Sequence, residues 1–298
     1  MLETVAESIV VRTTFAPAGQ AWFTAAVRAK RLLLDIGRVD IDVRKDSSRA
    51  RAYRIAIPAH TTVPVGTKVR LRGPFGAYDT EVAGFDVWAS RVVATLKLTP
   101  HLDSLVKKSD RLTASASRLG GAATAAVVSA TSGSASAPSI APVPDEPAAT
   151  CVRDSVPAAA RDRVKEVKDS LDVVVRAVPR PLYTGVSKKV SVKMSQANGC
   201  FGIGRIAISV VLRDDRNEWF VERLVLLDER GKVIVVKVSD LRFRGHEILG
   251  AYDADGDGID DLATRAATER AGATTILKFD PKGKKFERLT AGFAWEEM

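Results

Sequence analysis

The acidic loop 253-DADGDGIDD-261 is the stretch that most constrains this chain. It places carboxylates at loop positions one, three, five and nine, a glycine at position six and a backbone carbonyl at position seven. Several oxygens that converge from one tight turn are what a hard cation such as Ca²⁺ requires. The clustered carboxylates also repel one another, and a divalent ion would relieve that repulsion. The loop therefore predicts a calcium site.

The residues on either side decide which kind of calcium loop this is. An EF-hand needs two flanking helices and a bidentate glutamate at position twelve, which here is Thr264. The residues before the loop, Phe243 to Tyr252, favour a strand, and His246 among them is expected at the surface. The residues after the loop, Leu262 to Arg270, are rich in alanine, so a helical, dockerin-like arrangement stays open as an alternative.

Residues 244–290 resemble FG-GAP or VCBS-type calcium-binding repeats through the segment DADGDGIDDL. The resemblance implies that Asp260 points away from the metal. It implies these ligands of Ca²⁺: the side chains of Asp253, Asp255, Asp257 and Asp261, and the carbonyl of Ile259. Such repeats come in series, and a propeller needs several blades, but the chain has no second acidic loop. We therefore expect one calcium-clamped hairpin, not a complete propeller, with a weak affinity of roughly 10⁻⁴ to 10⁻³ M.

Composition divides the chain into three parts. Its 298 residues are 46% hydrophobic and 27% charged, as is typical of globular proteins. Between Thr113 and Thr150 the sequence becomes Ala, Ser, Gly, Thr and Pro, which cannot bury enough apolar area to offset the entropy of ordering. We predict a mainly β protein with an α+β N-terminal unit: a β-rich domain at 1–112, a flexible linker at 113–150, and an antiparallel β domain at 151–298 that carries the calcium loop.

Apolar periodicity predicts the elements of the N-terminal domain. Alternation indicates four strands, at Val39–Val43, Tyr53–Ile57, Val69–Leu71 and Val92–Leu98. Helical spacing predicts a helix over Gln20–Ile36, although its end also fits a hairpin, and a second helix over Pro100–Leu112 behind Thr99 as cap.

The C-terminal domain is expected to begin with a helix over Ala158–Leu171 and to continue as an antiparallel meander. The segments Asp228–Gly231 and Asp280–Gly283 are typical of hairpin turns that end in a glycine with positive φ.

Two cysteines, Cys151 and Cys200, could form a disulfide that pins the opening helix to the sheet, or stay as unpaired thiols. A disulfide is useful outside the reducing cytosol. With three histidines in the chain, the cysteine spacing fits no zinc pattern.

Other features bound the function without assigning it. No apolar run approaches the roughly 20 residues that span a bilayer, and residues 1–16 lack the features of a signal peptide. The net charge of +9 makes acidic polymers candidate partners, although the basic residues are scattered. No catalytic motif is present, and no catalytic residue is assigned.

We expect a non-enzymatic, extracytoplasmic protein, periplasmic, surface-bound or secreted, that binds Ca²⁺ and serves as an interaction or structural domain. Its partner would be an unidentified protein or polysaccharide, and its oligomeric state stays open. Two alternatives remain: a polysaccharide-acting hydrolase with a stabilising Ca²⁺ site, and a basic protein that binds nucleic acid or another polyanion.

Overall fold

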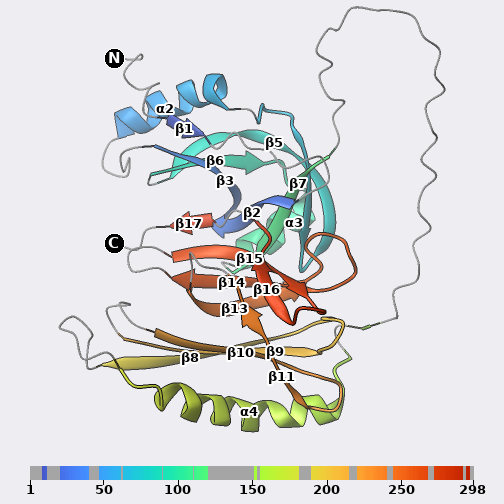
Figure 1. Cartoon of the computed structure of the whole chain (residues 1–298). Coiled ribbons are helices and arrows are strands. Elements are labelled where there is room, and N and C mark those ends of the chain that lie inside the picture. The colour runs from blue at the N-terminus through green and yellow to red at the C-terminus, as the bar shows by residue number, and fades with distance from the viewer. Residues whose placement is uncertain are drawn as a thin grey trace, which may run out of the picture.

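The computed structural model is mainly β, and its layers stack from an N-terminal barrel through two sheets to a covering helix (Figure 1). It describes residues 9–11, 21–39, 47–61, 63–88, 90–109, 111–119, 151–152, 155–180, 189–214, 220–239, 244–267, 272–290 and 293–295. Within these ranges no helix has the length and apolar character to cross a membrane. The antiparallel sheets do not form a propeller, in agreement with the prediction.

Six strands of the N-terminal half close into an antiparallel barrel, because β6 pairs with β5 on one side and with β3 on the other. The barrel strands are β2 (Ala21–Arg28), β3 (Arg31–Val39), β4 (Lys68–Gly73), β5 (Gly76–Trp88), β6 (Arg91–Leu96) and β7 (Thr113–Arg118). Three elements flank them: β1 (Ile9–Val11), which pairs with β3, α2 (Ser47–His60) and α3 (Pro100–Lys108). Fully buried Ile36, Leu71 and Val92 belong to the barrel core.

The helix predicted over Gln20–Ile36 is wrong, because this segment forms the β2–β3 hairpin that its end also suggested. Ala29 and Lys30 form the two-residue turn with φ of 48° and 59°, the conformation that matches the twist of the strands. Residues 23–27 are all buried. A strand buried on both faces loses its apolar alternation, so helical spacing appears in it by chance.

The strand predicted over Tyr53–Ile57 is also wrong, because this segment lies in α2. Tyr53 and Ile57 are buried, whereas Ile55 is 65% exposed. Residues four apart share a helix face, so the same apolar residues serve a helix here.

The other predictions for this half hold where the structure describes them. Strands β4 and β6 confirm two of the predicted strands, and α3 confirms the second helix but ends at Lys108, before the predicted Leu112. The Thr99 hydroxyl accepts a hydrogen bond from the Leu102 amide over 3.4 Å, as expected for the cap. Beyond Val39 the remaining predicted strand lies outside the described residues.

The predicted linker begins too early, because Thr113–Arg118 forms barrel strand β7. Its residues from Thr113 to Ala116 are buried. Their small side chains suit a strand that packs closely on both sides, although the same composition is typical of a linker. The rest of the predicted linker, from residue 120 to 150, lies outside the described residues.

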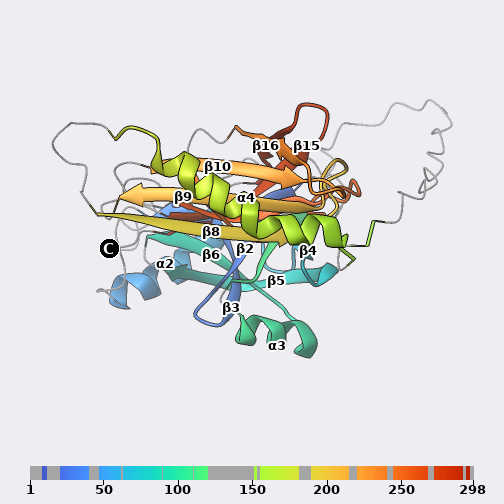
Figure 2. The same cartoon turned by 90° about the horizontal axis from the view of Figure 1, so that it is seen from below.

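In the C-terminal half, α4 (Ala158–Arg176) lies across a four-stranded antiparallel sheet (Figure 2). This confirms the predicted opening helix and extends it. The first sheet consists of β11 (Val233–Val235), β10 (Phe220–Leu227), β9 (Ile206–Asp214) and β8 (Val190–Asn198). The second sheet consists of β12 (Lys237–Val238), β16 (Lys285–Arg288), β15 (Gly272–Asp280), β14 (Asp261–Ala267) and β13 (Arg244–Tyr252), with β17 (Phe293–Trp295) also paired to β15.

The predicted single meander is therefore two stacked sheets, with one parallel pair between β12 and β16. The turn over Asp228–Gly231 has its expected glycine, with φ of 76° at Gly231. In the turn after Asp280 the positive φ falls on Lys284, at 49°, instead of on the predicted Gly283.

Aromatic side chains fill the core between the two sheets. Phe279 and Phe286 lie with ring centroids 4.6 Å apart, and Phe201 contacts both edge-on. The other face of the second sheet meets the barrel, where the hydroxyls of Thr24 and Thr290 lie 2.5 Å apart. The two halves of the chain thus share an interface.

Candidate metal centre

The acidic loop joins two paired strands, β13 and β14, so strands flank it on both sides. The helical, dockerin-like alternative after the loop is therefore wrong, because the residues from Asp261 onward extend as β14. Gly256 and Gly258 have φ of 90° and 83°. Glycine adopts this region without a steric penalty, so these two residues allow the chain to reverse tightly.

Three of the predicted ligands converge. One carboxylate oxygen from each of Asp253, Asp255 and Asp261 lies within 4.8 Å of the other two. The Asp253 carboxylate accepts hydrogen bonds from the amides of Gly256 and Gly258, over 2.6 and 3.1 Å, and so is held in place by the turn itself.

Asp261 forms the buried floor of this cluster. Its carboxylate accepts hydrogen bonds from the amides of Phe279, over 3.0 Å, and Ala254, over 3.2 Å. Burial raises the pKa of Asp261 to about 8, and the negative charges of Asp255 and Asp257 add to the increase, although the two amide bonds oppose it. A cation at the cluster would favour the ionised form.

The two remaining predicted ligands are placed differently. The Asp257 carboxylate accepts a hydrogen bond from the Ile259 amide over 2.9 Å and another from the Lys278 ammonium over 2.7 Å. The same ammonium also donates to Asp255. The carbonyl of Ile259 stays a predicted ligand.

Asp260 turns away from the cluster and pairs with Cys200. The Asp260 amide donates to the Cys200 carbonyl over 2.9 Å, and its carboxylate accepts from the Cys200 amide over 2.7 Å. Cys200 is bonded to Cys151, so the predicted disulfide is confirmed. Through Asp260 and the disulfide, the loop is therefore linked to the segment that leads into α4.

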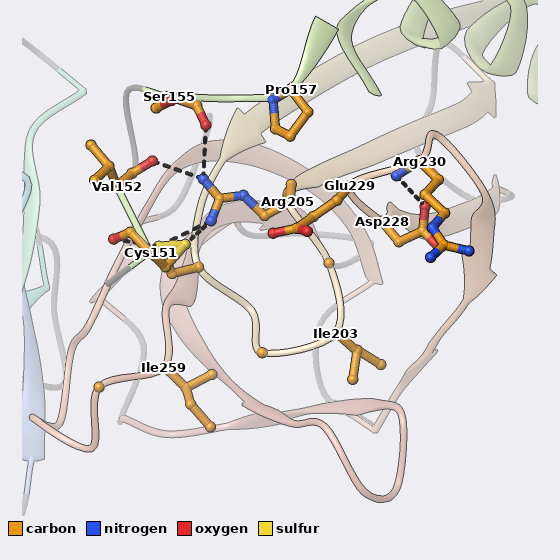
Figure 3. Close-up of a pocket in the computed structure, with 14 residues that line it drawn as sticks. Cys151, Val152, Ser155, Pro157, Ile203, Arg205, Asp228, Glu229, Arg230 and Ile259 are labelled. Atoms are coloured by element: carbon orange, nitrogen blue, oxygen red, sulfur yellow. Dashed lines mark hydrogen bonds between the residues drawn. A yellow bond between two sulfur atoms is a disulfide. The ribbon is translucent and has the colours of Figure 1, made fainter. Parts of the chain in front are cut away.

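The disulfide borders a cavity of about 780 Å³ that Ile259 also lines (Figure 3). At its edge the buried Arg205 guanidinium donates to the carbonyls of Val152, over 2.7 Å, and Ser155, over 3.2 Å (Figure 3). These bonds hold the chain before α4 against the first sheet.

The barrel contacts the loop from the opposite side. The Ser115 hydroxyl, on β7, donates to the Ala254 carbonyl. The Arg72 guanidinium, on β4, lies so close to Gly256 that a Cβ there would be 2.6 Å from its Nη2. The acidic loop is therefore the junction of the barrel, the second sheet and the disulfide-bonded segment.

Sequence reasoning missed a buried polar pair near the start of β13, at the end of that strand away from the acidic loop. His246 is not at the surface as expected but is 1% exposed, between the two sheets. Its Nδ1 lies 3.1 Å from Glu222 Oε1, and Glu222 also accepts from the amides of Gly245 and His246 over 3.0 Å. The period of β13, which puts His246 on the same face as buried Ile248, is the signal that could have revealed its position.

The geometry fits a hard cation through its oxygen donors. Three carboxylates converge, each accepts at least one hydrogen bond from a backbone amide, and a lysine ammonium lies against the cluster. No other group of three or more potential ligands occurs among the described residues. Comparisons with family models, curated proteins and solved structures found no match to this chain.

Proposed function

We propose that this protein is a non-enzymatic, exported or cell-surface calcium-binding protein, an interaction or structural domain whose loop 253–261 is clamped by Ca²⁺. The observation that carries the proposal is the position of the loop. Backbone and side-chain contacts join it to barrel residue Ser115 on one side and to disulfide residue Cys200 on the other. An ion that fixes this one turn would therefore stabilise three parts of the fold together.

The chemistry of the cluster supports calcium as the ion. Its donors are carboxylate oxygens, which hard cations prefer, and flexible oxygen sites suit Ca²⁺ better than Mg²⁺. The cost of keeping the buried Asp261 carboxylate ionised is a further reason for a cation there. The resemblance to FG-GAP or VCBS-type repeats is part of this proposal.

The disulfide supports the proposed location. Cys151 and Cys200 are bonded, and structural disulfides persist mainly in oxidising compartments. Extracellular calcium is also abundant enough to fill a site of weak affinity. An unidentified protein or polysaccharide is the proposed partner.

The test is urea unfolding of the full chain in 10 mM CaCl₂ and in excess chelator. If the dissociation constant is roughly 10⁻⁴ to 10⁻³ M, Ca²⁺ at this concentration should add about 1.4 to 2.7 kcal/mol to the free energy of unfolding. Asp253→Asn should lose this increment, because the amide carries no charge for the ion, while its one acceptor oxygen can still accept from the Gly256 amide.

Asp228→Asn is the matched control. Asp228 also caps its own turn, through bonds to the amides of Arg230 and Lys232 over 2.9 and 2.8 Å, but lies outside the acidic cluster. It should keep the full calcium response. Equal unfolding midpoints with Ca²⁺ and with chelator in the wild type would refute the proposal.

A further inference from the structure

Lys278 brings a positive charge into the acidic loop from a neighbouring strand. It lies on β15, which pairs with β14 directly after the loop. Its ammonium donates to Asp255 Oδ2 and, over 2.7 Å, to Asp257 Oδ2. The Lys278 side chain is 39% exposed, so it is held at the rim of the cluster and has open access to solvent.

These contacts occupy two of the carboxylates that the proposed ion would use. Asp255 belongs to the converging trio, and Asp257 is the fifth-position ligand that the resemblance implies. An ammonium and a divalent ion on the same oxygens would repel each other strongly at such short range. Both cations therefore cannot occupy the cluster at once.

We infer that Lys278 is a tethered competitor for the metal and sets the affinity of the site, an inference that rests on the proposed function. Ca²⁺ binding releases the ammonium into solvent. The strand need not move for this to happen, because the next amide, that of Phe279, stays bonded to Asp261 over 3.0 Å. A flexible side chain beside a fixed backbone suits such an exchange.

The effect on affinity follows from the exposure of the ion pairs. A lysine amine is charged throughout the neutral range, so both contacts of Lys278 are ion pairs at the pH of the titration. Ion pairs open to solvent are weak individually. Lys278 makes two such ion pairs, and the one with Asp255 is the more buried, because the Asp255 side chain is only 18% exposed. Together the two pairs should reduce calcium affinity by about tenfold.

Calorimetric titration of the full chain with CaCl₂ tests the inference. Lys278→Met keeps the length of the side chain without its charge and should tighten binding about tenfold, and Lys278→Gln should do the same as a polar neutral variant. Lys278→Arg keeps the charge and should bind as weakly as the wild type. The matched control is Lys285→Met, which removes an exposed lysine that pairs with Glu287 over 2.6 Å and should leave affinity unchanged.

The outcomes separate the two ideas. Equal calcium affinity in the wild type and both neutral Lys278 variants would overturn the inference and leave the proposed function standing. Binding by the neutral variants alone would support the competition and refute calcium as the ion of the natural chain. Absence of binding in every protein, with urea midpoints in chelator showing that all are folded, would overturn both.

Discussion

Removing the disulfide between Cys151 and Cys200 tests how much this cross-link stabilises the fold by restricting the unfolded chain. The two cysteines are 49 residues apart in sequence. Release of a closed loop of this length increases the entropy of the unfolded chain, which corresponds to about 4 kcal/mol at 25 °C. The loop encloses α4 and β8, so the loss should appear in the global unfolding of the C-terminal half.

The assay is urea unfolding of the double variant Cys151→Ser, Cys200→Ser, with excess chelator so that metal binding does not contribute. Its midpoint should fall by more than about 1 M relative to the oxidised wild type. The reduced wild type should match the variant, which controls for the substitutions themselves. A difference below about 1 kcal/mol would refute this reasoning, because it would show that the unfolded chain gains little entropy when the bond is removed.

Three further predictions concern the junction and the core. Gly256→Ala should destabilise the protein by about 1 to 2 kcal/mol, because φ is 90°, a conformation that alanine adopts only at a steric cost, and its Cβ would also displace the end of the Arg72 side chain. Gly250→Ala, with open space around it, should change stability by less than about 0.5 kcal/mol in the same urea assay. Burial alone would raise the pKa of Glu222, but its hydrogen bonds, first of all with His246, lower that pKa. The native state therefore binds fewer protons than the unfolded chain, and stability should fall as pH drops below about 4.5 and through the lower native pKa. Glu222→Gln should flatten this dependence in unfolding midpoints measured from pH 6 to 3. Phe279→Ala should cost about 3 to 5 kcal/mol by thermal or urea unfolding, and equal stability to the wild type would contradict the packing described between the sheets.

Elements with strong local determinants were predicted from the sequence. The helix α3 has a threonine cap followed by proline, and α4 follows Pro157, so their starts depend on neighbours a few residues apart. The Asp228–Gly231 turn needs a glycine at one position for the same local reason.

Elements whose burial depends on distant strands were not predicted. The β2–β3 hairpin is buried on both faces, by the barrel core and by the second sheet, and therefore has no alternation to detect. Residues 113–117 of strand β7 are all small, and composition alone cannot distinguish a closely packed strand of this kind from a linker. The burial of His246 likewise depends on a second sheet that the sequence did not reveal.

The candidate site also combines features with local determinants and features that depend on distant parts of the chain. The sequence by itself determined the acidic loop, its glycines and its set of carboxylates, because ligand spacing within nine residues is a local property, and it indicated the pairing of the two cysteines. The tertiary structure alone decided that Lys278 meets Asp255 and Asp257, that Asp260 pairs with Cys200, and that Ser115 of the barrel reaches the loop. These contacts join residues that are 21 to 139 positions apart, and only the closure of the barrel and the stacking of the two sheets bring them together.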